Sequence, residues 1–145
     1  MSPRAFIDTN VWVYAVDTAD NDKQTRALEI LEPDVEKDYV ISAQVLGEFY
    51  ATVSGKLGAA VPAADGRAMV ERMKQLPVVP LDVSLVDEAI TGSQSWRISY
   101  WDSLIVAAAR AAGCEVLVSE DLAHGVTYGG VRVENPFLRT ASSDG

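Results

Sequence analysis

Four acidic side chains lie where the surrounding sequence is apolar. They are Asp8, Glu48, Asp102 and Asp121. Asp102 illustrates the pattern, because a helix over 101–112 puts Ile105, Val106 and Ala109 on the same face as this carboxylate. A carboxylate that points toward a core is costly unless another group compensates its charge. Four such acids on separate elements therefore predict one shared acidic pocket that holds a divalent cation.

The other three acids also border apolar segments. Asp8 ends the run 5–7, and Glu48 flanks an apolar helical stripe that includes Val45 and Phe49. Asp121 follows the strand-like segment 116–118, with two residues between them. In open α/β folds ligands bind beyond the carboxyl ends of the strands. We therefore expect Asp8 and Asp121 to lie at the same edge of a sheet.

The donor types of this set favour a hard cation. Cys114 is the sole cysteine and His124 the sole histidine, so a cysteine-based or histidine-rich zinc site is excluded. An oxygen-only donor set suits Mg²⁺, for which Mn²⁺ can substitute. Such an ion lowers the pKa of a bound water and neutralises charge that grows on a phosphoryl group. The predicted chemistry is phosphodiester hydrolysis.

Each acid taken alone also has a purely structural interpretation. Asp8 could be the N-cap of the next helix, and Asp102 lies three residues after Ser99, which is the spacing of a capping box. Glu48 could reach solvent from the edge of its stripe, and Asp121 could belong to a turn. One metal site accounts for all four acids together, and we therefore prefer it.

The composition is that of an ordinary globular protein. The chain has 145 residues, 48% of them apolar and 23% charged, which predicts one domain over 1–145 with a frayed tail at about 139–145. No apolar run is long enough to cross a bilayer, and the first residues leave no room for a signal peptide. We expect a cytoplasmic protein that has no disulfide and no membrane partner.

The net charge of −9 argues against a broad basic surface for nucleic acid. Setting aside the four candidate ligands still leaves −5. A nucleic-acid substrate would therefore be held locally, by bound metal and a few basic side chains. The candidates are Lys56, Arg97, Arg132 and Arg139, of which we consider Lys56 and Arg97 first.

Periodicity predicts short strands that alternate with helices. The expected strands cover 5–7, 39–41, 78–79, 115–118 and 131–133. The expected helices cover about 9–16, 21–31, 43–54, 62–73, 84–91 and 101–112. Within them, Ser42 and Ser84 are the expected N-caps of two helices, and Ala68, Met69 and Met73 form the expected inner face of a third. This alternation predicts an α/β fold with a mostly parallel sheet covered on both faces.

Several motifs together resemble the PIN-domain ribonucleases, and within them the VapC toxins of bacterial toxin–antitoxin pairs. The segment 7–10 (Ile-Asp-Thr-Asn) is similar to the opening motif of that family. Glu48 stands on the second main helix, where the family has its acid. The segments 100–103 (Tyr-Trp-Asp-Ser), 119–122 (Ser-Glu-Asp-Leu) and 135–137 (Asn-Pro-Phe) are similar to later family motifs. The resemblance covers nearly the whole chain.

The resemblance implies a PIN-like three-layer fold and an Mg²⁺-dependent endoribonuclease. It assigns the four acids as catalytic, with Asp8, Asp102 and Asp121 as metal ligands. It also implies a homodimer and a VapB-type antitoxin whose C-terminal segment blocks the site. Asn10 and Ser119 would be polar supports, whereas we expect Glu120, which directly precedes the matching acid, to face outward.

Two other functions remain as alternatives. An aspartate-dependent phosphatase would use Asp8 as its nucleophile, but such an enzyme normally needs a second aspartate where this chain has Asn10. The second alternative is a catalytically inactive scaffold that keeps the fold only for binding. A complete set of four acids argues against it, because burying like charges without a metal destabilises a fold.

Overall fold

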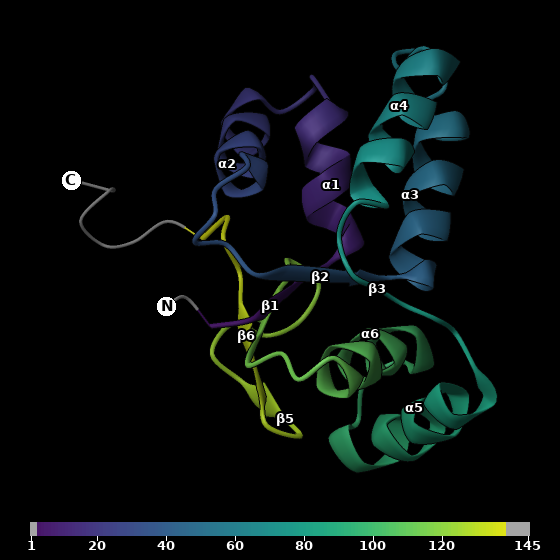
Figure 1. Cartoon of the computed structure of the whole chain (residues 1–145), viewed down its shortest axis with the longest axis vertical. Coiled ribbons are helices and arrows are strands. Elements are labelled where there is room, and N and C mark those ends of the chain that lie inside the picture. Colours follow the sequence, from purple (N-terminus) through teal and green to yellow (C-terminus); the bar gives the residue numbers. More distant parts are fainter. Residues whose placement is uncertain (1–2, 139–145) are drawn as a thin grey trace.

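Six short strands form one central sheet in the order β3-β2-β1-β4-β6-β5 (Figure 1). The computed structural model describes residues 3–138. The strand bounds are β1 Ala5–Ile7, β2 Tyr39–Ser42, β3 Val78–Val79, β4 Val116–Val118, β5 Thr127–Tyr128 and β6 Val131–Glu134. Every neighbouring pair is parallel except β5 and β6. The mostly parallel sheet predicted from the sequence is confirmed.

Helices cover both faces of this sheet, which makes the three-layer fold that was expected. Their bounds are α1 Thr9–Val16, α2 Asn21–Leu31, α3 Ala43–Ser54, α4 Ala63–Met73, α5 Val83–Trp96 and α6 Tyr100–Ala111. Figure 1 shows α1 to α4 on one side of the strands and the packed pair α5 and α6 on the other. None of these helices is long and apolar enough to span a bilayer.

Both faces of the sheet are covered because consecutive residues of its central strands are apolar. Phe6, Ile7, Val40, Ile41 and Leu117 are completely buried. Strands with this continuous pattern belong in the middle of an α/β sheet rather than at a solvent-facing surface. The fold therefore leaves the polar residues of this region at the ends of the strands.

Local capping places the helix that carries Asp102. The hydroxyl of Ser99 accepts a hydrogen bond from the backbone N–H of Asp102 at 3.1 Å and so starts α6. Gly113, at φ +73°, follows the helix in the left-handed conformation that stops it. Ser42 caps α3 in the same way, as predicted.

Helix α5 differs from its prediction at both ends. Its N-cap is Asp82 and not Ser84, because the Asp82 carboxylate accepts from the N–H of Leu85 at 2.8 Å. It continues to Trp96 and not to residue 91. A Cβ on Gly92 would lie only 2.3 Å from the Trp96 ring, so the glycine that weakens the helix lets that ring pack. Tertiary packing outweighs helix propensity here.

Three further details depart from the sequence predictions. Of the predicted inner face of α4, Met73 is buried and Met69 is partly buried, whereas Ala68 is exposed and Gly66 is buried in addition. Strand β5 was missed, although the Gly129–Gly130 pair that joins it to β6 is a recognisable hairpin turn. The predicted tail 139–145, which includes Arg139, lies outside the described residues.

Candidate acidic site

Asp8 is the most buried acid of the set, with 4% of its surface exposed. It follows β1 directly and caps α1, because one carboxylate oxygen accepts from the N–H of Thr9 at 2.7 Å. The other oxygen accepts from the hydroxyl of Ser119, also at 2.7 Å. The capping interpretation is correct for the first oxygen, while the second faces the end of β4.

The charge state of Asp8 is strongly perturbed. Burial raises the pKa of this carboxyl to about 7, although the hydrogen bonds from Ser119 and Thr9 oppose the rise. The negative charges of Asp121 and Glu48 raise it further. These electrostatic effects show that the carboxylates of Asp8, Asp121 and Glu48 share one environment.

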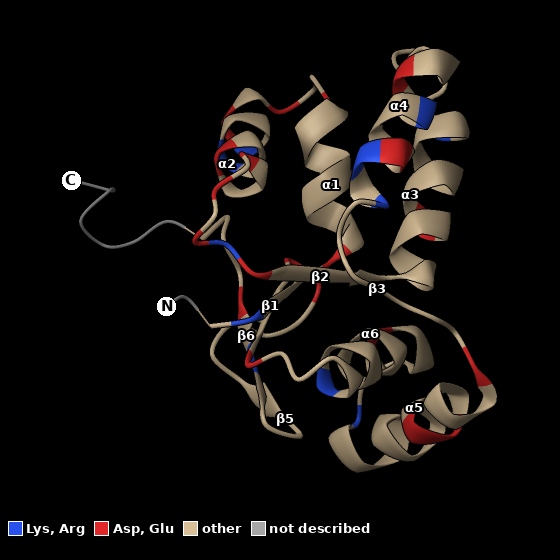
Figure 2. Cartoon of the chain, viewed as in Figure 1, with Lys and Arg blue, Asp and Glu red and all other residues tan. Residues whose placement is uncertain are grey.

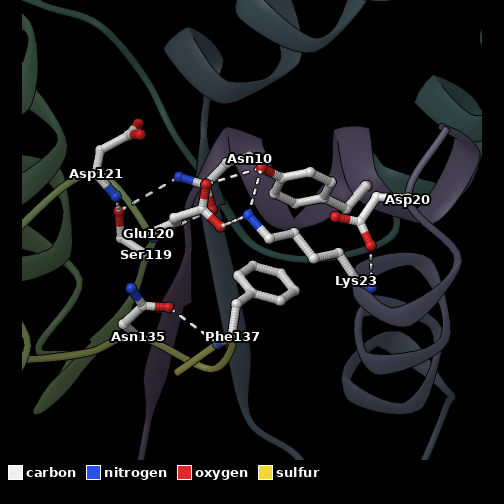
Figure 3. A network of polar contacts seen from close by, with 9 residues as sticks. Asn10, Asp20, Lys23, Ser119, Glu120, Asp121, Asn135 and Phe137 are labelled. Carbon is white, nitrogen blue, oxygen red and sulfur yellow. Dashed lines mark hydrogen bonds and ion pairs between the residues drawn. The ribbon is translucent and has the colours of Figure 1, made fainter. Parts of the chain in front are cut away.

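Asp8 and Asp121 lie at the same edge of the sheet, as expected. Ile7 and Val118 are paired in register on the neighbouring strands β1 and β4, and the N–H of Asp8 donates to the carbonyl of Val118 at 3.0 Å. The N–H of Asp121 donates to the Ser119 hydroxyl at 3.1 Å. Its carboxylate is exposed and points away from the neighbouring Glu120 side chain in Figure 3.

Glu48 is held in place by neutral donors. The hydroxyl of Thr9 donates to its Oε1 at 2.8 Å, and the amide of Gln44 donates to its Oε2 at 3.3 Å. The same amide donates to the backbone carbonyl of Trp101 at 3.2 Å. Because Thr9 is next to Asp8 and Trp101 is next to Asp102, these bonds join three helices that carry acids.

Asp102 is half-buried in the first turn of α6. Burial raises the pKa of its carboxyl, the hydrogen bond with Ser99 lowers it, and the charge of Asp121 raises it again. The capping-box spacing is therefore real, but the cap involves the backbone N–H of Asp102. The carboxylate of Asp102 is left beside that of Asp121.

Within residues 3–138, no salt bridge reaches any of these four carboxylates. Over the same residues, no group of three or more His, Cys, Asp or Glu side chains lies close enough together to hold a metal ion. The four carboxylates therefore share a region without forming a preformed cluster of ligands. Their oxygen donors and uncompensated charge fit a hard divalent cation.

The two predicted supporting residues, Asn10 and Ser119, contact each other and the segment that carries Asp121. Asn10 donates to the Ser119 hydroxyl at 3.5 Å, and its carbonyl oxygen accepts from the N–H of Glu120 at 3.3 Å. Ser119 is completely buried. Thr9 and Gln44 were not anticipated from the sequence, although both are one helical turn or less from an assigned acid. Glu120 points away from Asp121 in Figure 3, but it is not the free surface residue that was expected, since its side chain is bound by Tyr14 and Lys23.

The basic candidates lie at different places. Lys56 follows the end of α3, so a rise of 1.5 Å per residue puts it about 12 Å along the axis from Glu48. Arg132 is paired with Glu134 on β6. Arg97 is exposed in the turn between α5 and α6, two residues before the Ser99 cap. Its φ of +55° is the only positive value at a non-glycine residue in the described part of the chain. Figure 2 shows few basic residues around the carboxyl ends of β1 and β4, where Asp8 and Asp121 lie.

Comparison with known families gives the identification. The PIN domain model matches residues 5–127. The chain belongs to the PIN domain family. No curated protein sequence matches it. The Asp8, Glu48, Asp102 and Asp121 carboxylates therefore lie on a PIN fold, at the carboxyl end of its central strands.

Solved structures share this PIN fold at low sequence identity. A toxin–antitoxin complex from Klebsiella pneumoniae matches with a TM-score of 0.65 and 16% identity, over 92% of this chain and 98% of that one. DNA-bound VapBC from Salmonella typhimurium matches at 0.64 and 17%, over 93% and 99%. The sarcin–ricin-loop-cleaving toxin VapC20 from Mycobacterium tuberculosis matches at 0.59 and 19%, over 81% and 89%. These likenesses support the fold.

Proposed function

We propose that this PIN domain is a VapC-type toxin that hydrolyses RNA phosphodiester bonds with a divalent cation, Mg²⁺ first and Mn²⁺ as a substitute. The observation that carries the proposal is the Asp8 carboxyl. It is buried among other acids, and no basic side chain in the described chain is paired with it. The hydrogen bonds from Ser119 and Thr9 stabilise its anion only in part, and a divalent cation from outside would supply the missing positive charge. The family and the toxin–antitoxin structures of the same fold support this function.

In this proposal Asp8, Asp102 and Asp121 bind the cation, and Ser119 and Thr9 hold Asp8 in position. The cation would supply Lewis-acid activation of a water molecule and neutralise charge on the phosphoryl group. Glu48 is assigned as the group that orients the attacking water, because Thr9 and Gln44 fix its two oxygens. Asp121 has the freest carboxylate of the set and would turn inward to complete the ligand shell.

Calorimetric titration with Mn²⁺ and with Mg²⁺ tests the metal assignment at a pH above 7, where Asp8 is ionised. We expect saturable binding by the protein as it stands, and a clear loss of binding in Asp8→Asn. Asp87→Asn is the matched control, since Asp87 is an exposed acid on α5 and should leave binding unchanged. Equal binding by both variants would contradict the assignment.

The alternatives fit the geometry less well. In a phosphatase, position 10 would carry a general acid, but the Asn10 carbonyl oxygen is engaged by the N–H of Glu120. The side chain therefore acts as a brace for the 119–121 segment. An inactive scaffold would gain stability by replacing at least one of the mutually repelling acids. A chain that bound neither cation and cleaved no RNA would support the scaffold.

An antitoxin is the proposed protein partner. An apolar groove of about 700 Å³ lies between α1, α2 and α4, away from the acids. Leu28 on its rim is 50% exposed, and Trp12 and Met69 line it. A groove of this kind suits the apolar face of a helix. If a VapB-type antitoxin binds there, Leu28→Glu should weaken the complex and leave cleavage by the free toxin intact.

We also propose that the toxin is a homodimer that holds RNA between its subunits. Trp101 is 62% exposed and Tyr50 is 52% exposed, which is unusual for aromatic residues outside an interface. Arg97 is the best-placed side chain for a phosphate, because it precedes the turn that carries Asp102. Gel filtration with light scattering should give twice the mass of the monomer. A strictly monomeric but fully active protein would contradict the dimer.

A further inference from the structure

The side chain of Glu120 is anchored on the helices next to the site. Its Oε1 accepts from the hydroxyl of Tyr14 at 2.7 Å, and its Oε2 is paired with Lys23 Nζ at 2.8 Å. The Lys23 ammonium also donates to the Tyr14 hydroxyl at 3.2 Å. Figure 3 shows Lys23 of α2 reaching Glu120 in the segment after β4, and Tyr14 contributes its hydroxyl from α1. Three separate parts of the chain are therefore tied together by one acid.

Aromatic rings partly shield this anchor from water. Lys23 Nζ lies 4.8 Å from the centre of the Tyr14 ring and 5.8 Å from that of Phe137. The two rings contact each other edge to face at 4.9 Å. The N–H of Phe137 donates to the Asn135 side chain at 2.9 Å, which shapes the turn that brings the ring there. The Asn-Pro-Phe motif thus covers the Lys23–Glu120 pair, and the two side chains are only 33% and 27% exposed.

The positive charge of Lys23 in this pair is also insensitive to pH. The hydrogen bond to Glu120 raises the pKa of Lys23 above its usual value, and the bond to Tyr14 adds to the rise. Lys23 therefore stays charged over the whole working range of pH. Its charge cancels that of Glu120, the acid that directly precedes Asp121 in the chain.

The backbone transmits this anchoring to the site. The N–H of Glu120 donates to Asn10, and the flanking Ser119 hydroxyl contacts both Asp8 and the N–H of Asp121. The chain bends at residues 120–122, after the end of β4. Fixing Glu120 against α1 and α2 therefore fixes the bend that carries Ser119 and Asp121 on its two sides. In Figure 3 the carboxylates of Glu120 and Asp121 do point apart.

We propose that Lys23, Tyr14 and Glu120 are positioning residues, which hold the 119–121 segment so that Asp121 presents its carboxylate to the acidic site. Their importance for catalysis rests on the proposed function, whereas the anchoring of the segment does not. Lys23 is not assigned a contact with substrate, because its ammonium already faces Glu120 and the two aromatic rings. Asn135 and Phe137 serve the anchor by covering it.

Four single variants and one double variant test the anchor. Lys23→Met and Glu120→Gln remove one charge each with little change in shape, Lys23→Arg keeps the charge, and Lys74→Met is the matched control. Lys74 is paired with Glu71 on α4 at 3.1 Å, so this control also breaks a salt bridge, but on an exposed helix surface. Two readouts are measured: backbone amide exchange at 119–122 in EDTA, and Mn²⁺ binding by calorimetry.

We expect Lys23→Met and Glu120→Gln each to speed amide exchange at 119–122 roughly tenfold, with exchange in β1 unchanged. We expect Mn²⁺ affinity to fall by roughly tenfold, as it does when a partner of a metal ligand is removed. Lys23→Arg should keep most of the amide protection and most of the Mn²⁺ affinity. Lys74→Met should change neither quantity. The double variant Lys23→Met/Glu120→Gln should be no worse than either single one, since both break the same pair.

The outcomes separate this inference from the proposed function. If the unmodified protein binds no Mn²⁺ and cleaves no RNA, the proposed function fails, while faster amide exchange would still establish the anchor. If the unmodified protein binds Mn²⁺ and the Lys23 and Glu120 variants match it in both readouts, the positioning role is wrong. Equal effects in Lys74→Met would also overturn it, because any lost salt bridge would then suffice.

Discussion

Glu120 and Asp121 are adjacent acids in one turn, and the fold uses them in opposite ways. Glu120 has its charge cancelled by Lys23 and its oxygens bound by Lys23 and Tyr14. Asp121 has no salt bridge within the described chain, and its charge raises the pKa of both Asp8 and Asp102. Lys23 therefore neutralises Glu120, and the charge of Asp121 stays uncompensated. Among the described residues, the candidate metal ligand Asp121 has no paired basic side chain, whereas the positioning residue Glu120 has one.

The sharpest test of this comparison is to remove an uncompensated charge. We expect Asp102→Asn to lower RNA cleavage by roughly 10³-fold or more, since the carboxylate contributes to stabilising the transition state. Thermal stability should stay the same or rise, because one of several repelling charges is gone. Cleavage rates measured with Mg²⁺ check the first part, and melting temperatures measured in EDTA check the second. Near-normal cleavage, or clear loss of stability, would make Asp102 a structural residue of the α6 cap.

The second prediction concerns the ends left by cleavage. A metal-activated water that attacks phosphorus in line leaves a 5′-phosphate and a 3′-hydroxyl. The described site contains no histidine to activate the 2′-hydroxyl of RNA, and Asp8, whose pKa is raised to about 7, is buried and has both oxygens engaged by Thr9 and Ser119. We expect fragments that ligate as 5′-phosphates, and no cleavage in excess EDTA. Cyclic phosphate ends would refute the use of a metal-activated water.

The third prediction uses the pH dependence of stability. The folded-state pKa of Asp8 is about 7 and its ordinary value is 3.8, so the folded protein binds the proton more tightly than the unfolded chain does. Asp8 therefore destabilises the fold as the pH rises from about 4 to about 7. At about 1.4 kcal/mol per unit, the full difference is on the order of 4 kcal/mol.

Asp8→Asn isolates this contribution from the other carboxylates. An asparagine can still accept from Thr9 and meet the Ser119 hydroxyl, but it carries no charge at any pH. In EDTA, we expect the variant to be more stable than the unmodified protein at pH 8 and nearly equal to it at pH 4. Denaturant unfolding at several pH values measures the gap. A gap that does not widen with pH would mean that Asp8 is not strained by its ionisation.

Much of this arrangement could be predicted because the relevant signals are local. The alternation of strands and helices, the Ser42 and Ser99 caps and the edge shared by Asp8 and Asp121 all follow from nearby residues. The candidate acids were found for the same reason, since each one interrupts an apolar pattern. Their roles as metal ligands remain a prediction.

The errors concern features that depend on residues distant in the sequence. The orientation of Glu120 is set by Lys23, which lies 97 residues away in the chain. The length of α5 is set by the packing of Trp96 over Gly92, not by the helix propensity of its last turn. Gln44 could not be linked to α6 before the fold placed it next to the Trp101 carbonyl. The hydrophobic periodicity of the sequence does not predict which of these distant residues contact each other.

The smallest expected effect concerns Glu48, an acid held by neutral donors rather than by a cation. The Thr9 hydroxyl donates to its Oε1 at 2.8 Å, which orients the carboxylate without cancelling its charge. Thr9→Val removes that donor and keeps the shape, so cleavage should fall by about tenfold while stability changes by only about 1 kcal/mol. Thr9→Ser retains a hydroxyl and should recover most of the rate. Single-turnover cleavage and thermal unfolding measure the two quantities. A loss as large as that of Asp102→Asn would show that Thr9 has a larger part in the site than orienting Glu48, and no loss would show that Gln44 alone is enough to hold it.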